Sequence, residues 1–256
     1  MGEFMRVLFG LVILALSGCG GDEALRMAAA PPLPLIDIEA GRTYAQFTTD
    51  VNKIANTTAT DRMEVAVNSL SDIDVTFGGK TVALSSNGDG VLSISDDGKV
   101  FLEIGKSIAG GPTMENVLLF FLSERVPGNL AYSHRLYMVE GNEAPGIPTI
   151  GGATFSGIFK GTAENDTNFS GSAVLTADFV SGTMSGTLSG DAGYTYKFDP
   201  VPFSGVGFQA ALFEENDPSI TGEIQGKIYG ADGSEVAGPF VVEGPNFGAG
   251  IFTATK

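Results

Sequence analysis

The chain has 256 residues, and its 30 acidic residues against 14 basic residues give a formal net charge of −16. This charge argues against nucleic acid and anionic lipid surfaces as partners, because binding to either depends on Lys and Arg side chains that neutralise phosphates. A cationic protein or a cation suits the charge, and simple solubility is the alternative explanation.

Residues 1–18 have the layout of a secretory signal peptide. One positive charge, at Arg6, precedes the short apolar run Val7–Leu16, and small residues follow that run. The run is too short for a transmembrane helix, which needs about 20 apolar residues. The sequence therefore predicts export, with Met1 or Met5 as the start of translation.

Cys19 ends the stretch Leu-Ser-Gly-Cys, which resembles the bacterial lipobox, where a cysteine receives diacylglycerol before the signal peptide is cut. It is the only cysteine in the chain, so a lipidated thiol leaves none for disulfides, and a free cysteine is the alternative. The resemblance implies a mature chain that begins at Cys19 and is held stably by several acyl chains. In lipoproteins of this kind, an Asp directly after the cysteine implies retention in the inner membrane. This chain has Gly20 at that position, so we expect delivery to the outer membrane.

Residues 19–34 are rich in Gly, Ala and Pro, which predicts a flexible tether. Residues 35–140 are predicted to form a strand-rich, handle-like N-terminal domain. Short β-type runs in this region are separated by Gly-Gly, Asn-Gly and Asp-Gly pairs, which favour tight hairpin turns. The runs are 63–67, 73–77, 81–84, 91–94 and 100–104, and the turn pairs are 78–79, 87–88, 89–90 and 97–98.

Two features mark the end of this region. The segment 116–122 is almost continuously apolar, which indicates a strand buried on both faces, with a short buried helix as the alternative. Residues 141–152 contain Pro145, Pro148 and several glycines, which predicts a linker between two domains.

Residues 153–256 show alternation with a period of two, which indicates half-buried strands. In 180–190, Val, Met, Leu and Gly occupy one face and Ser and Thr the other, while 220–230 places Ile and Gly opposite polar residues. The eight predicted strands are 154–160, 168–177, 180–190, 194–199, 203–212, 220–230, 238–243 and 248–255. Phe-Ser-Gly recurs at 155–157, 169–171 and 203–205, which suggests hairpins of one design.

Eight antiparallel strands suit a small closed barrel, because closure removes exposed sheet edges. A barrel that spans a membrane would need an apolar outside with aromatic girdles, and the chain contains no Trp. The predicted fold class is therefore all-β, with the strand-rich N-terminal domain followed by an eight-stranded antiparallel β-barrel over 153–256.

The second half resembles the barrel domain of transferrin-binding protein B and related bacterial surface lipoproteins. The shared pattern is a strand that ends Gly226-Lys-Ile-Tyr-Gly230, then a turn, Glu235, a short Gly-rich strand and a final Gly250-Ile-Phe252 strand. The resemblance covers residues 151–256. The chain differs from the family in two respects: Ile228 stands where the family usually has an aromatic residue, and the chain has a single lobe where transferrin binders have two. It implies an outer-membrane lipoprotein that captures a host protein or small ligand for an integral transporter.

Tyr132 and His134 are the candidate ligand contacts, because they fall on one face of a predicted strand and His134 is the only histidine. A haem or metal site built on this pair is one alternative, and an incidental histidine is the simpler explanation. The acidic turns near 87–90 and 96–98 lack the spaced acids and closing Glu of a calcium loop. No cofactor is predicted other than covalent lipid on Cys19.

The sequence contains no Gly-x-Ser-x-Gly nucleophile elbow and no phosphate-cradling loop followed by Lys. We therefore expect no enzymatic activity. The sequence predicts a lipid-anchored protein of the outer membrane, with display at the cell surface as one orientation, that binds a protein or small solute and acts with an outer-membrane transporter. A structural envelope lipoprotein without a soluble ligand is the alternative.

Overall fold

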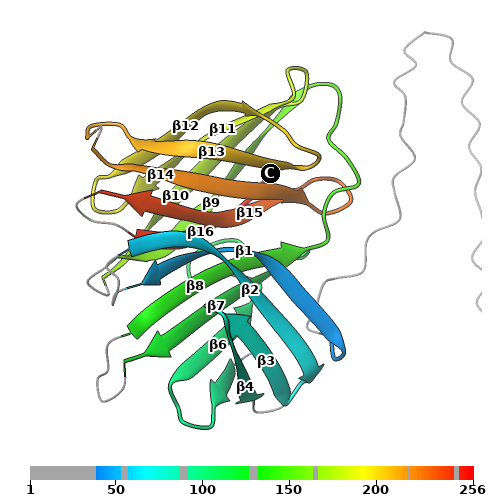
Figure 1. Cartoon of the computed structure of the whole chain (residues 1–256). Coiled ribbons are helices and arrows are strands. Elements are labelled where there is room, and N and C mark those ends of the chain that lie inside the picture. The colour runs from blue at the N-terminus through cyan, green and yellow to red at the C-terminus, as the bar shows by residue number, and fades with distance from the viewer. Residues whose placement is uncertain are drawn as a thin grey trace, which may run out of the picture. The chain divides into compact units, whose positions relative to one another are not determined.

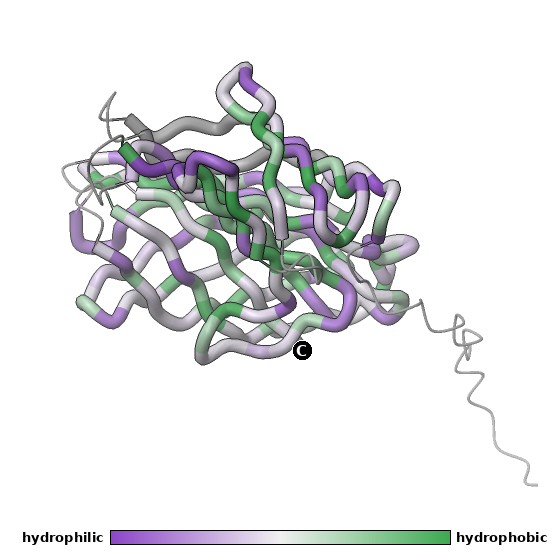
Figure 2. The backbone as a smooth tube through the Cα atoms, turned by 90° about the horizontal axis from the view of Figure 1, so that it is seen from below, coloured by the Kyte–Doolittle hydropathy of each residue, from purple (hydrophilic) through white to green (hydrophobic). Residues whose placement is uncertain are grey.

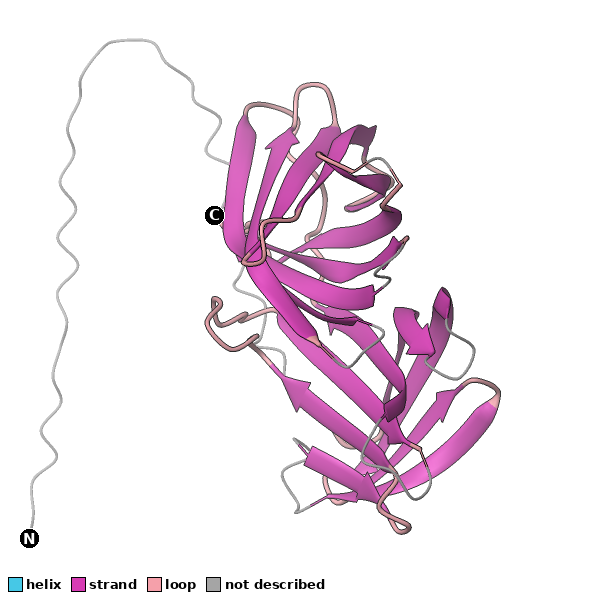
Figure 3. Cartoon of the chain, turned by 90° about the vertical axis from the view of Figure 1, so that its left-hand side faces the viewer, coloured by secondary structure: helices cyan, strands magenta, loops and turns pink. Residues whose placement is uncertain are grey.

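The computed structural model of the protein describes residues 39–52, 57–86, 92–126, 132–163, 167–217, 219–244 and 248–256. These segments form sixteen β-strands and contain no helix (Figure 3), so the predicted all-β class is confirmed. The segments described accordingly include no helix that could cross a membrane. The predicted signal peptide, Cys19 and the tether lie outside the described residues.

The first eight strands form a closed antiparallel barrel, called the first barrel (Figure 1). They are β1 (Arg42–Asn52), β2 (Thr57–Ser69), β3 (Asp72–Phe77), β4 (Lys80–Ser86), β5 (Leu92–Ser95), β6 (Val100–Gly105), β7 (Val117–Arg125) and β8 (Tyr132–Gly141). Gly78 and Gly79 have φ values of 54° and 75° in the β3–β4 turn, which confirms the hairpin predicted there. The turn pairs predicted at 87–90 lie outside the described residues.

Closure of the first barrel goes beyond the sequence prediction of a strand-rich domain. β1 pairs with β8, with Thr49 opposite Tyr137 and Asn52 opposite His134. All other neighbours in this barrel are strands that are consecutive in the sequence. The closing pair joins strands from opposite ends of the domain, and no local pattern reports such a contact.

The last eight strands form the second closed antiparallel barrel, as predicted. They are β9 (Gly152–Ala163), β10 (Asn168–Asp178), β11 (Thr183–Gly190), β12 (Thr195–Pro202), β13 (Gly207–Glu214), β14 (Thr221–Tyr229), β15 (Glu235–Glu243) and β16 (Gly248–Thr255). Buried and exposed residues alternate along β10 and β13, which agrees with the period of two that predicted the strands. Hydrophilic and hydrophobic residues are interspersed along the backbone (Figure 2).

Phenyl rings and glycines together fill the interior of the second barrel. A Cβ atom added to Gly226 would lie 2.7 Å from the ring of Phe208 and 2.9 Å from that of Phe252. A Cβ on Gly186 would lie 2.6 Å from the Phe198 ring. The inward glycines therefore provide the space that rings from neighbouring strands occupy, in a barrel only wide enough to be filled by side chains.

Two predicted strands begin later than expected. β11 starts at Thr183, and Val180, assigned by alternation to the inward face, is 74% exposed in the preceding turn. The Asp178 carboxylate accepts hydrogen bonds from the backbone N–H groups of Val180 and Ser181, at 2.9 and 3.2 Å, and so fixes that turn. Likewise β13 begins at Gly207, so the Phe-Ser-Gly at 203–205 lies before the strand, unlike the other two copies.

Four strands bury both of their faces, because the outer walls of the two barrels pack together. In β7, Leu118 and Phe120 belong to the core of the first barrel, while Val117 and Leu119 belong to a cluster that also contains Ile251 and Ala249 of the second barrel. Strands β8, β15 and β16 contribute to the same cluster, called the interbarrel core, whose buried members are Ile108, Met114, Val117, Leu119, Tyr137, Val139, Tyr229, Ala237, Ala249 and Ile251. The apolar run 116–122 is thus a strand buried on both faces, as predicted.

Two residues of the family-like motif lie in this interface. The Glu235 carboxylate, 4% exposed, accepts hydrogen bonds from the backbone N–H of Glu115 at 2.7 Å and from that of Asn116 at 3.0 Å. Burial raises the pKa of Tyr229, with the Glu140 and Glu143 carboxylates adding to the effect, so its phenol stays neutral in the interbarrel core. The motif that indicated a barrel therefore also shapes the contact between barrels.

Candidate functional site

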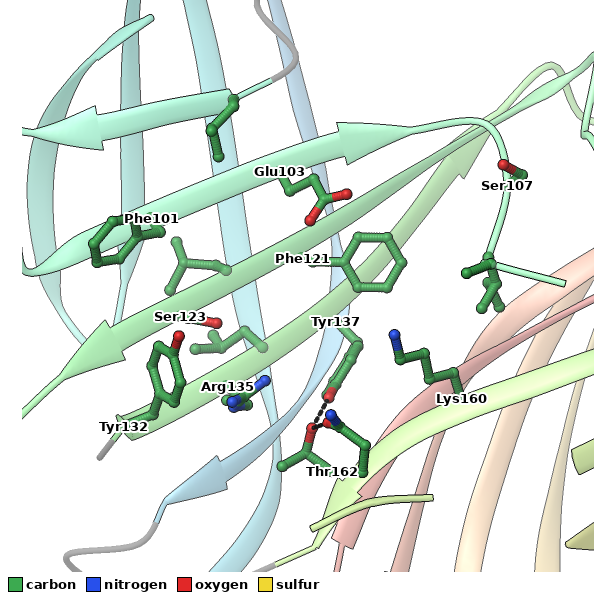
Figure 4. Close-up of a pocket in the computed structure, with 16 residues that line it drawn as sticks. Phe101, Glu103, Ser107, Phe121, Ser123, Tyr132, Arg135, Tyr137, Lys160 and Thr162 are labelled. Carbon is green, nitrogen blue, oxygen red and sulfur yellow. Dashed lines mark hydrogen bonds between the residues drawn. The ribbon is translucent and has the colours of Figure 1, made fainter. Parts of the chain in front are cut away.

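A cavity of about 330 Å³, called the basic cavity, lies where β6, β7 and β8 of the first barrel meet β9 and β10 of the second. Aromatic rings and charged groups share its wall (Figure 4). Its lining residues are Leu92, Phe101, Glu103, Ser107, Ile108, Ala109, Phe121, Leu122, Ser123, Tyr132, Arg135, Leu136, Tyr137, Lys160, Thr162 and Asn168. Concave sites of this size and mixed chemistry are typical of ligand binding.

Cations and aromatic rings alternate at one end of the basic cavity. The guanidinium carbon of Arg135 lies 4.0 Å from the centroid of the Tyr132 ring, and that of Arg125 lies 4.4 Å from the Phe101 centroid. Arg125 also lies 5.9 Å from the Tyr132 ring, so the four side chains form one ladder. Each cation–π contact contributes about 0.5–1 kcal/mol when exposed, and more where water is excluded. The ladder therefore holds two positive charges close together.

Side chains from both barrels meet at the other end. The Tyr137 hydroxyl donates a hydrogen bond of 2.7 Å to Thr162 Oγ1, and the Thr162 hydroxyl donates one of 3.2 Å to Asn168 Oδ1. Lys160 extends from β9 toward the space beside Tyr137 (Figure 4). These contacts join the barrels at the cavity and fix the ring of Tyr137.

The charge of the basic cavity is opposite to that of the whole chain. Arg135 and Lys160 line it, and Glu103 is the single acidic residue among the lining residues that the structure describes. Arg125 adds a further positive charge behind Tyr132. An acidic group in the cavity would meet guanidinium and ammonium donors, which form charge-assisted hydrogen bonds to carboxylates. The arrangement suits binding of an anionic group.

Tyr132 and His134 do not share a face. Pairing between β7 and β8 shifts by one residue, so that Glu124 lies opposite His134 but Arg125 lies opposite Tyr132. Tyr132 lines the basic cavity, whereas His134 continues the alternation of Leu136 and Met138, which lie in the core of the first barrel. The prediction of a shared face is wrong, because an irregularity in pairing reverses the alternation on which it rested.

The structure therefore brings Tyr132 to a candidate site without His134. Among the described residues, no group of three or more His, Cys, Asp or Glu side chains is placed to hold a metal ion. Sequence analysis missed Arg125, Arg135 and Lys160. Arg125 and Arg135 are basic residues close to Tyr132 in the sequence of an acidic chain, and this proximity could have indicated them. Lys160 lies in the other barrel, and no sequence feature links it to Tyr132.

Two closed antiparallel barrels with packed outer walls define the class as an all-β double-barrel protein. No family model matches the chain, and no curated protein is significantly similar to it. Among solved structures, it is similar to intact two-lobed Ap-TbpB, a transferrin-binding protein B, at 14% identity with a TM-score of 0.53, over 81% of this chain and 45% of that one. A point mutant of transferrin-binding protein B from Haemophilus parasuis Hp5 is similar at 13% identity and a TM-score of 0.54, over 82% and 44% of the respective chains.

These similarities confirm the fold resemblance inferred from the sequence. The chain has a transferrin-binding-protein-B-like fold and spans less than half the length of the two relatives. At 13–14% identity, the likeness concerns fold and not ligand.

Proposed function

We propose that the protein is an outer-membrane lipoprotein whose double barrel captures a protein or small solute, through an acidic group of that ligand, for a transporter. The observation that carries the proposal is the basic cavity, which holds Arg135 against the Tyr132 ring and Lys160 beside Tyr137, in a chain of net charge −16. A positive cavity in an acidic protein focuses the local potential and selects ligands that present a negative group. The fold of transferrin-binding protein B lobes supports a binding role over catalysis.

The test is a pull-down from growth medium with the protein lacking residues 1–34. We expect a retained protein or solute that is lost when Arg135→Gln and Lys160→Gln are combined, because the cavity then has no basic lining residue among those described. Lys197→Gln is the matched control, because Lys197 pairs with Glu215 on the second barrel and does not line the cavity. A thermal melt of each variant checks that the barrels remain folded.

The structural alternative makes the opposite prediction. A protein that serves only as an envelope spacer retains nothing above background, and then the capture function is wrong. Retention that is equal in the native protein and the double variant would place the binding surface elsewhere and remove the basic cavity as its site.

The anchor is proposed on Cys19, which lies outside the described residues. We expect Cys19→Ser to move the protein from the membrane fraction to the soluble fraction, because the acyl chains supply about 0.8 kcal/mol for each buried methylene. Fractionation with immunoblotting measures this, and Ser17→Ala, two residues before the proposed lipid site, is the control. If the serine variant stays in the membrane fraction, the protein is held there by something other than this lipid.

A further inference from the structure

A second cavity, of about 340 Å³, lies at one end of the second barrel and is called the aromatic cavity. The adjoining ends of the β9–β10, β11–β12, β13–β14 and β15–β16 hairpins all contribute to its wall. Its lining residues are Phe159, Ala163, Thr167, Asn168, Phe169, Ser170, Gly190, Asp191, Ala192, Tyr194, Tyr196, Ile220 and Val242. Mouths of β-barrels are frequent places for small-molecule sites.

Four aromatic rings face this space. Tyr194 and Tyr196 stack with centroids 6.4 Å apart and an interplanar angle of 15°, and Phe159 and Phe169 lie 6.1 Å apart at 56°. Tyr194 is 40% exposed while Phe159 is fully buried, so the rings extend from the rim to the floor. A ligand at this position would contact ring faces and edges at several depths.

Gly190 keeps the cavity open. A Cβ atom added there would lie 3.4 Å from the backbone oxygen of Tyr194 and 3.7 Å from Cζ of Phe159, which are ordinary contact distances. The backbone therefore accepts a side chain at this position, in contrast to Gly171, whose added Cβ would lie 2.0 Å from the Ser189 backbone oxygen. Strand packing therefore does not require a glycine at position 190. The cavity has room beside Gly190 because this residue carries no side chain.

The electrostatics of the aromatic cavity favour a positive ligand. Its described lining residues include Asp191 and no Lys, Arg or His. Glu214 lies opposite Tyr196 in the sheet. Burial raises the pKa of the Glu214 carboxyl, but hydrogen bonds from the backbone N–H groups of Thr195, Asn216 and Asp217 outweigh burial, so the pKa is lowered. Burial, with the added effect of Tyr194 and Glu214, raises the pKa of Tyr196 to about 12.

We propose that the aromatic cavity binds a small organic cation of the alkylammonium class, with the cationic head over the tyrosine rings and Asp191 and Glu214 as the nearby negative charges. Aromatic rings attract such cations through their quadrupoles, and quaternary ammonium groups are the ligands that clusters of rings recognise best. The carboxylates balance the charge without requiring a hydrogen-bond donor on the ligand. Among the described lining residues, this site shares Asn168 alone with the basic cavity, whose chemistry suits the opposite charge.

The test compares phenyltrimethylammonium with its neutral isostere tert-butylbenzene, by ligand-observed NMR titration of the folded protein. We expect saturable binding of the ammonium compound and at least tenfold weaker binding of the neutral one, because only the first interacts with the ring quadrupoles and carboxylates through a charge. Equal affinity for the two probes, or no saturable binding of the cation, would overturn the proposal.

Variants then locate the site. We expect Tyr194→Ala to weaken binding about tenfold and Gly190→Leu to abolish it by filling the cavity, while Tyr194→Phe retains it. Phe213→Ala is the matched control, since Phe213 is similarly exposed at 37% but does not line the cavity. Cation binding that survives Gly190→Leu in a folded protein would also overturn the proposal. The variants Arg135→Gln and Lys160→Gln should leave this titration unchanged, which separates it from the capture function.

Discussion

Replacing Glu235 by alanine is expected to lower the free energy of unfolding by about 3 kcal/mol, because the change leaves three part-buried donors that precede β7 without their acceptor. The carboxylate receives the backbone N–H groups of Glu115 and Asn116 and also the Asn116 side-chain amide, at 3.3 Å. A buried donor without a partner is unfavourable by about 1–3 kcal/mol, and the lower end applies to these donors because they are part-buried. Urea unfolding followed by circular dichroism measures the loss.

The same substitution should loosen the contact between the barrels, because the three donors belong to the loop that precedes β7, whose side chains enter the interbarrel core. Glu243→Ala is the control, since Glu243 lies on the same strand and is exposed. Its free energy of unfolding should change by no more than about 0.5 kcal/mol. Equal, small effects for the two variants would show that the Glu235 hydrogen bonds contribute little to stability.

Gly238→Ala is expected to destabilise the second barrel by about 3 kcal/mol or more, which is the upper end of the effect of overpacking a well-filled interior. A Cβ atom at this position would lie 1.9 Å from the backbone oxygen of Gln225 and 2.7 Å from Cα of Gly226. Both contacts are with backbone of β14, so no side chain can rotate away and the two strands must separate. Thermal unfolding and urea titration should both report the loss.

Gly190→Ala is the matched control for Gly238→Ala, because it adds the same methyl group at a glycine of the same barrel where the nearest atom lies 3.4 Å away. We expect its stability to stay within about 0.5 kcal/mol of the native protein. If both alanine variants are as stable as the native chain, strand separation at Gly238 is easier than the geometry implies, and glycine there is not required for barrel closure.

Much of the candidate chemistry could not be predicted from the sequence. Tyr132 was identified from its neighbourhood, but its pairing with His134 failed because one irregularity between β7 and β8 reversed which face each residue occupies. Lys160 and Arg135 line one cavity only because strands of different barrels lie side by side. The family-like motif predicted a barrel correctly, yet nothing in its spacing showed that Glu235 would bind the backbone of residues 115 and 116.

The sequence by itself determined most of the strands, the turn between β3 and β4, and the eight-stranded second barrel, because alternation and turn-forming glycines act between residues that are close in the chain. No predicted run covers β1. Tertiary structure decided the pairing of β1 with β8, the second buried face of the 116–122 run, and the two cavities. The physical reason is that alternation records which face of a strand avoids water. It does not record which distant strand covers that face.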